Sequence, residues 1–227
     1  LQDDNPTTTT PWVTWSLMGI CVLVFLWQLS LGENGRNAIY ALGMMPAVVF
    51  GEVQLPQALD IIPAWLTIFS SMFLHSNWMH LIGNMIYLWI FGDNIEQAMG
   101  HGRYLLFYLL CGFVAAMAQA LPDISSQIPM IGASGAIAGA LRSYLLLYPR
   151  ANVIVWVPLG IIMLTQRVPA AFVLGFYFLM QLYSSMATDT SQGGIAFGAH
   201  IGGFIAGMLL VLVFKKSNVQ LFAPARQ

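Results

Sequence analysis

Six long apolar stretches, separated by short polar segments, constrain this chain more than any other feature. A helix of about 20 apolar residues is the length that crosses the hydrocarbon core of a bilayer. Of the 227 residues, 58% are hydrophobic and only 7% are charged, whereas about a quarter of the residues are charged in a typical soluble domain. The sequence therefore predicts an all-α polytopic membrane protein whose spans cover residues 12–31, 78–98, 104–121, 132–148, 168–187 and 195–214.

The segments between these stretches suggest how the spans are connected. Residues 1–11 are polar and contain two prolines, which predicts a disordered tail. Residues 32–63 are too broken to span and too apolar to be a free linker, so we expect a membrane-associated loop, followed by a short interfacial helix at 65–74. We interpret 150–167 as a connecting loop along the bilayer, 188–194 as a polar turn and 215–227 as a C-terminal tail. The first stretch lacks a signal-peptide pattern, so we expect a retained span.

The basic residues predict the orientation of the six-span bundle. An even number of spans places both termini on one side, and loops on the cytoplasmic side are enriched in Lys and Arg. Arg36 is the one basic residue on the other side. The seven on the side of the termini are Arg103, Arg142, Arg150, Arg167, Lys215, Lys216 and Arg226. Both termini are therefore predicted to be cytoplasmic, and the second, fourth and sixth spans run from outside to inside.

Charge and cysteine content argue against several classes of function. The net charge of −1 gives no electrostatic reason to expect a nucleic-acid partner. Cys21 and Cys111 both fall inside apolar stretches, which is typical of packing rather than of a disulfide framework or a metal site. We therefore expect no metal and no cofactor.

Four polar residues inside the predicted spans are candidates for function, because polar groups in a bilayer are costly. They are His80, Asn84, Ser134 and His200. Ser134 lies 15 residues before Pro149 and His200 lies 15 residues before Lys215. At roughly 1.5 Å per residue, both lie about 8 Å below the outer surface of a core roughly 30 Å thick. Asn84, about 9 Å into its span by the same rise, belongs to this outer layer too.

A serine and a histidine at equal depth suggest a nucleophile and its general base. A histidine nitrogen can take the serine proton during attack and return it to the leaving amine. The two helices must then approach closely, and small residues four apart make that possible. Such pairs are present in both spans, at Gly135 and Gly139, Gly198 and Gly202, and Gly203 and Gly207.

The second span could supply donors for an oxyanion hole. His80 and Asn84 are four residues apart and share a helix face. Ser134 begins its helix, so its backbone N–H is a free donor that points the same way. An Asp or Glu is absent from this layer of the sequence, so a Ser134–His200 dyad is the simplest interpretation.

Structural roles are the competing interpretation for each of these residues taken singly. A membrane serine commonly bonds to its own helix, and His80 or Asn84 could hold helices together. His200 could equally be a structural residue or part of a proton relay. Packing residues have no reason to gather in one outer layer, however, so the shared depth favours a catalytic site. His75 is expected at the interface with an open role, and His101 lies on the cytoplasmic side.

Three motifs resemble the signatures of rhomboid intramembrane serine proteases, in the same order along the chain. They are Gly132-Ala133-Ser134-Gly135 with Ala136-Ile137-Ala138-Gly139, Ala199-His200-Ile201-Gly202-Gly203, and His75-(x4)-His80-(x3)-Asn84-Met85. Supporting matches are Gly92-Asp93-Asn94-(x)-Glu96 with Gly100 and Arg103, and Tyr148-Pro149-Arg150. The resemblance covers roughly residues 60–214 and corresponds to the six-span core of bacterial members.

The resemblance implies a serine endopeptidase in a bacterial inner membrane that cleaves transmembrane segments of membrane proteins near the outer face. Ser134 and His200 would be the dyad, and His80, Asn84 and the Ser134 N–H would form the oxyanion hole. The fifth span and residues 188–194 would form the mobile side through which substrate arrives.

This sequence departs from the family pattern at two positions. Some members have a Tyr four residues after the serine that stacks on the histidine, and here that residue is Ala138. Arg142, two turns below the serine, is expected to snorkel or to pair, because a buried guanidinium is costly.

Two other functions remain open from the residues. A non-catalytic rhomboid-like protein that binds membrane clients would normally lack the serine or the histidine. A transporter or channel would use His80, Asn84 and His200 as part of a polar path through the full depth of the membrane. The inner half here offers mainly Arg142, which disfavours such a path.

Overall fold

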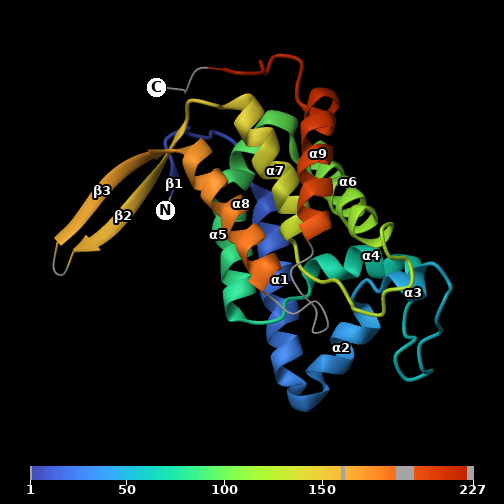
Figure 1. Ribbon diagram of the computed structural model, residues 1–227. Helices are drawn as coiled ribbons and strands as arrows, with labels where there is room; N and C mark the ends of the chain where they lie inside the picture. Colours follow the sequence, from blue (N-terminus) through green and yellow to red (C-terminus); the bar gives the residue numbers. More distant parts are fainter. Residues whose placement is uncertain (1, 160–161, 188–196, 224–227) are drawn as a thin grey trace.

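The computed structural model describes residues 2–159, 162–187 and 197–223, and within them the chain is a bundle of long helices (Figure 1). The long helices lie close to the six apolar stretches of the sequence. They are α1 (Trp12–Ser30), α5 (Trp78–Met99), α6 (His101–Ala120), α7 (Ser134–Leu147), α8 (Ala170–Ala187) and α9 (Phe197–Phe214). The expected start of the last span at residue 195 and the polar turn at 188–194 lie outside the described residues.

Local sequence explains where several of these helices begin and end. Asn77 caps α5, because its side-chain oxygen accepts a hydrogen bond of 2.9 Å from the backbone N–H of His80. Gly100 adopts a φ of 84° and separates α5 from α6 by a single residue. Only a glycine enters this left-handed region without strain.

Two of the described helices, α1 and α6, are at least 18 residues long and apolar enough in composition to cross a membrane. The helix α7 is shorter, with 14 residues. The outward faces carry large exposed hydrophobic side chains, such as Met79 at 78% and Leu23 at 68% exposure. An apolar outer surface of this kind fits lipid rather than water around the bundle.

The centre of the bundle is filled by aromatic side chains and by close helix contacts. Phe91, Tyr104, Phe107, Tyr108 and Tyr144 are at most 1% exposed. The helix α9 packs against α6 and α7, and α7 also contacts α5. The segment before α1 and the segment after α9 lie at one end of the bundle, here called the terminal end, and the opposite end carries the connection from α1 to α5 (Figure 1).

The connection from α1 to α5 consists of short helical pieces, as the broken pattern of residues 32–63 suggested. They are η1 (Gly32–Asn34), α2 (Gly35–Leu42), α3 (Pro46–Val49), η2 (Ala64–Leu66), α4 (Thr67–Ser70) and η3 (Ser71–Phe73). The last three occupy the place of the expected interfacial helix at 65–74. Met44 and Met130 form an isolated antiparallel bridge that ties this connection to the segment before α7.

The all-α fold class is wrong in one respect, because the chain contains a three-stranded antiparallel sheet in the order β1-β2-β3. The strands β2 (Asn152–Leu159) and β3 (Ile162–Pro169) form a hairpin where a connecting loop was expected, and β1 (Gln2–Asp3) pairs with the base of β2. The run Val153-Ile154-Val155-Trp156-Val157 explains this outcome, since β-branched and aromatic residues favour strands. The hairpin extends sideways from the bundle (Figure 1).

The disordered tail expected at residues 1–11 is also wrong for the residues that the structure describes. Groups of this segment bond to the terminal ends of α5 and α7, which is a use of polar residues that short-range patterns do not reveal. The bonds join Asp3 to Tyr144 (2.5 Å), Thr7 to Asp93 (3.0 Å) and the backbone N–H of Thr8 to Gln97 (2.5 Å), and Thr14 at the start of α1 adds a bond to Glu96 (2.7 Å).

Candidate active site

Ser134 is the first residue of α7 and lies partly exposed toward the end of the bundle opposite the termini. The chain reaches it through Gly132, which has a φ of 114° and donates its N–H to the carbonyl oxygen of Ser71 over 2.8 Å. Because the first N–H groups of a helix have no partner within that helix, the Ser134 N–H is available to a ligand.

His200 lies on α9 with its Nε2 atom 2.7 Å from the Ser134 Oγ atom, which is hydrogen-bond distance. The depth comparison placed these two residues in one layer, and the structure brings them into contact. His200 is 2% exposed, so its ring is enclosed by protein. Within the described part of the chain its Nδ1 atom has no hydrogen-bond partner.

Glycines bring the backbones of α7 and α9 together at this point. A Cβ atom added to Gly203 would overlap the carbonyl oxygen of Gly135, and one added to Gly207 would overlap that of Gly139. One helical turn beyond Gly139, the Ser143 hydroxyl lies 3.0 Å from the carbonyl oxygens of both Gly139 and Gly207. The serine–histidine distance therefore depends on backbone contact, which larger side chains would prevent.

His80 and Asn84 lie beside the approach to Ser134. A Cβ atom added to Gly132 would come within 2.6 Å of the His80 ring and 3.8 Å of the Asn84 Nδ2 atom. His80 is partly exposed, its Nδ1 atom lies 3.2 Å from the Ser76 hydroxyl, and Asn84 is 3% exposed. Polar groups of α5 are thus gathered next to the first turn of α7.

His75, whose role the sequence left open, orients Asn84. Its Nε2 atom lies 3.0 Å from the Asn84 Nδ2 atom, and its Nδ1 atom lies 3.3 Å from the carbonyl oxygen of Phe73. Burial, with a smaller effect of nearby His80, lowers the pKa of His75 to about 4. A neutral His75 accepts one N–H of the Asn84 amide and leaves the second N–H free for another acceptor.

Gln28 is a supporting residue that the sequence analysis missed. Its side-chain amide bonds to both the N–H (3.1 Å) and the carbonyl oxygen (3.3 Å) of His75. The signal in the sequence was a glutamine inside the apolar stretch 12–31, because a polar group that becomes buried requires a partner.

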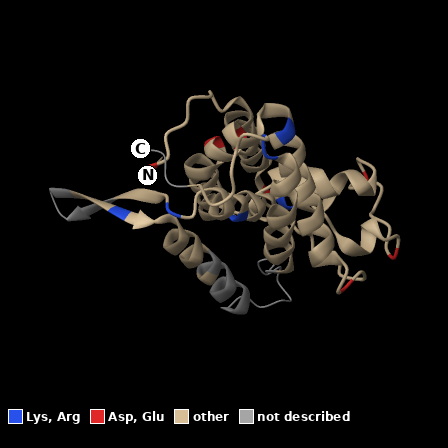
Figure 2. Cartoon of the chain, turned by 90° about the horizontal axis from the view of Figure 1, so that it is seen from above, with Lys and Arg blue, Asp and Glu red and all other residues tan. Residues whose placement is uncertain are grey.

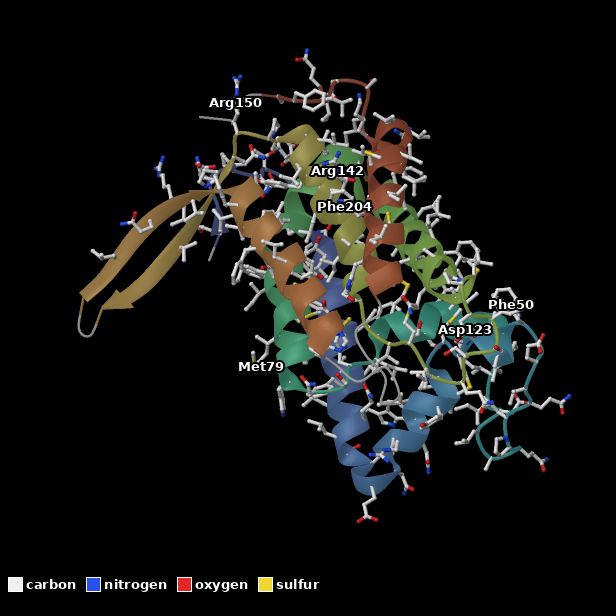
Figure 3. The ribbon with its side chains drawn as sticks, in the orientation of Figure 1. Phe50, Met79, Asp123, Arg142, Arg150 and Phe204 are labelled. Carbon is white, nitrogen blue, oxygen red and sulfur yellow. The ribbon has the colours of Figure 1, made fainter. Side chains whose placement is uncertain are left out.

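Arg142 has the aromatic partner that the sequence could not assign. Its guanidinium carbon lies 4.8 Å from the centre of the Phe204 ring, a cation–π distance, and its Nη2 atom lies 3.4 Å from the Met208 sulfur (Figure 3). These contacts join α7 to α9 below the site.

Ala138, the other departure from the family pattern, is 1% exposed and presents only a methyl group.

The arrangement fits proton transfer and nucleophilic attack, with a hydroxyl, an imidazole and a set of N–H donors in one place. Metal-binding clusters of three or more His, Cys, Asp or Glu groups are absent among the described residues. Cys21 and Cys111 are buried free thiols. The described residues thus offer groups for acid–base chemistry at Ser134.

Comparison with known proteins matches the Rhomboid domain family to residues 63–217 of this chain. The chain is 25% identical over 189 residues to Rhomboid protein 1, mitochondrial, of Saccharomyces cerevisiae, covering 77% of this chain and 52% of that protein. It is 25% identical over 206 residues to Rhomboid protease GluP of Bacillus subtilis, covering 91% of this chain and 34% of that protein. It is 23% identical over 204 residues to Rhomboid protease GlpG of Klebsiella pneumoniae, covering 88% and 62%. The chain spans about half the length of the curated relatives that it matches.

Proposed function

Because the chain belongs to the rhomboid family, we propose that it is an intramembrane serine endopeptidase that cleaves transmembrane segments of membrane proteins. The observation that carries this proposal is the 2.7 Å contact between Ser134 Oγ and His200 Nε2, in a site where His200 is buried. Relatives named as proteases support the reaction class.

The first half of the reaction uses the dyad as nucleophile and base. The Ser134 hydroxyl donates its hydrogen bond to His200 Nε2, so the neutral ring carries its proton on Nδ1. As Oγ attacks the carbonyl carbon of the scissile bond, the hydroxyl proton passes to Nε2. The imidazolium then gives this proton to the departing amine, and an ester between Ser134 and the substrate remains.

The donors on α5 and at the start of α7 stabilise the charge that develops on the carbonyl oxygen. The Ser134 N–H, the free N–H of Asn84 and the His80 ring form the proposed oxyanion hole. A single donor of this kind contributes about 3–4 kcal/mol to the transition state in enzymes where it has been tested.

The second half of the reaction requires water, which reaches the serine from the nearby end of the bundle. His200 takes a proton from that water, the hydroxide attacks the ester carbonyl, and the proton returns to Ser134 Oγ. The substrate must unwind locally before it is cut, because the peptide bonds of a helix are shielded by its own hydrogen bonds.

We place the bundle in the membrane with six spans and with the terminal end in the cytoplasm. Arg150, which lies at that end of the bundle (Figure 3), supports this placement, and Figure 2, seen from above, shows Lys and Arg on the helices and on the hairpin. The rhomboid proteins to which the chain is similar include mitochondrial and chloroplastic proteins as well as bacterial ones. A membrane location is therefore supported, and a bacterial inner membrane is the specific proposal.

The test is cleavage of a single-span substrate by the purified protein reconstituted in lipid vesicles. Ser134→Ala and His200→Ala should each abolish cleavage while melting at the same temperature as the unaltered protein. Thr67→Ala, which removes a hydroxyl on α4 that donates to the carbonyl oxygen of Ala64 in η2, serves as a control and should cleave normally.

Full cleavage by either dyad variant would contradict the proposal. An unaltered protein that retains a bound transmembrane segment uncut would point to a client-binding protein instead. Movement of solute or ions through the vesicle wall without cleavage would point to a transporter.

A further inference from the structure

Among the described residues, His200 lacks the hydrogen-bonded partner that usually fixes the ring of a general base. In a triad, a carboxylate bonded to Nδ1 holds the imidazole in place. Here the buried Nδ1 atom of His200 has no hydrogen-bond partner among the described residues. The methyl group of Ala138, one turn after Ser134, is too small to cover the ring. The bond to Ser134 fixes one edge of the imidazole, so packing must fix its plane.

Tyr177 on α8 supplies an aromatic contact to the His200 ring, which the small side chain of Ala138 on α7 does not supply. The centres of the Tyr177 and His200 rings lie 6.4 Å apart, and the ring planes are inclined by 69° in an edge-to-face arrangement. Aromatic pairs favour this geometry at separations of about 4.5–7 Å. Tyr177 is 5% exposed, so the contact is shielded from solvent and lipid.

Tyr177 is itself held by a row of aromatic side chains that leads away from the site. Its ring lies 4.4 Å from that of Tyr87 on α5, which stacks on Phe91 at 6.3 Å. Phe91 contacts Tyr144 of α7 at 4.7 Å. Tyr177 therefore rests on the packed centre of the bundle, and its position limits the orientations that His200 can adopt.

We propose that Tyr177 is a positioning residue for the reaction, which holds the His200 ring in line with Ser134 from α8. This inference rests on the proposed protease function. In this role the tyrosine takes no part in making or breaking bonds, and it acts by lowering the number of ring orientations that compete with the productive one. Pre-organisation of this kind raises the rate of the chemical step rather than the affinity for substrate.

The test compares Tyr177→Leu with Tyr177→Phe in reconstituted protein. Tyr177→Leu removes the ring and should lower kcat on the order of tenfold with little change in KM, a small part of the 10²–10⁴ that a general base supplies. Tyr177→Phe keeps the ring and should restore most of the rate. Phe176→Leu is the matched control, because Phe176 is the preceding residue on α8 and is 62% exposed. It should leave kcat unchanged.

A small fluorophosphonate probe separates positioning of the dyad from access of the large substrate through α8. If Tyr177 positions His200, labelling of Ser134 slows in Tyr177→Leu by about the same factor as kcat. Labelling at the unaltered rate, or a loss confined to KM, would overturn the inference. Rates are expressed per folded protein, and Tyr177→Met repeats the test if the leucine variant folds poorly. A failure of the unaltered protein to label or cleave would instead contradict the proposed function.

Discussion

The helices α7 and α8 both contact α9, but they do so by different means. Between α7 and α9 the backbones touch, because Gly203 and Gly207 lie directly on the carbonyl groups of Gly135 and Gly139. On α8, a Cβ atom added to Gly175 would meet no described atom within 4 Å, and the contact with His200 comes from the Tyr177 side chain. In the proposed mechanism the first interface sets the distance between Ser134 and His200, whereas the second sets the orientation of the His200 ring.

The largest effect is expected where the backbones touch. Gly203→Ala places a methyl group on the Gly135 carbonyl, so α7 and α9 must separate and Ser134 must move away from His200. We expect at least a hundredfold loss of cleavage and a loss of stability of about 1–3 kcal/mol. Gly175→Ala makes the same change on α8 and should leave cleavage unaltered. Equal losses in the two variants, measured by substrate cleavage and thermal unfolding, would remove the distinction between the interfaces.

Removing a hydrogen-bond donor from the proposed oxyanion hole should lower cleavage almost as strongly. Asn84→Ala removes the amide that His75 orients, and kcat should fall by about 10²–10³ with a smaller change in KM. Asn94→Ala is the control, because Asn94 is also a buried asparagine of α5 but bonds to Asn5 and Asp3 at the terminal end. Retention of full kcat in Asn84→Ala would exclude this amide from the oxyanion hole.

A smaller effect is expected at Tyr87, the residue on α5 on which Tyr177 rests. Tyr87→Leu removes the ring on which Tyr177 rests, while the contact between Tyr177 and His200 can still form. We expect kcat to fall about threefold, less than in Tyr177→Leu, since an aromatic pair contributes about 0.5–1.5 kcal/mol. Trp89→Leu, an exposed change on the same helix, should have no effect. A larger loss of kcat in Tyr87→Leu than in Tyr177→Leu would contradict the proposal that Tyr177 holds His200 and that Tyr87 acts through Tyr177.

The smallest effect on cleavage, less than about twofold, is expected when the N-terminal segment detaches from α5 and α7. The attachment of this segment should depend on pH. Burial raises the pKa of Asp3 to about 7, nearby Asp93 and Asp4 act in the same direction, and the hydrogen bond from Tyr144 opposes them. The attached segment therefore keeps a proton on Asp3 that the released segment loses above a pH of about 4. Attachment is favoured at low pH and weakens as the pH rises through about 7.

Hydrogen exchange of residues 2–11, corrected for the intrinsic exchange rate, measures this attachment. Protection should fall between pH 5 and pH 8 in the unaltered protein, values chosen on either side of the Asp3 pKa of about 7. Asp3→Asn should show little dependence on pH over the same range. Asp123→Asn, at the opposite end of the bundle, should behave like the unaltered protein. Protection that rises with pH would contradict the assignment.

The long helices and the meeting of Ser134 with His200 could be predicted because both follow from short-range patterns. Apolar length marks a helix, and glycines four residues apart mark a close contact between helices. The hairpin was missed because the apolar residues of β2 also suit a loop along the bilayer, although their β-branched character favoured a strand.

Contacts between side chains distant in sequence could not be predicted from these patterns. Asp3 bonds to Tyr144, 141 residues away, and Gln28 bonds to His75, 47 residues away. No periodicity links such pairs, and the same is true of Tyr177 and His200. The candidate dyad could thus be found from sequence, whereas the residues that orient it required the fold.

The assignment of Ser134 as nucleophile and His200 as base is tested by mapping where a fluorophosphonate probe attaches to the reconstituted protein. We expect one phosphonylated peptide that contains Ser134, formed at a rate that drops sharply in His200→Ala. Ser143, whose hydroxyl bonds to two backbone carbonyls, should remain unlabelled. Labelling that persists in Ser134→Ala, or that proceeds at full rate without His200, would show that these two residues are not the nucleophile and its base.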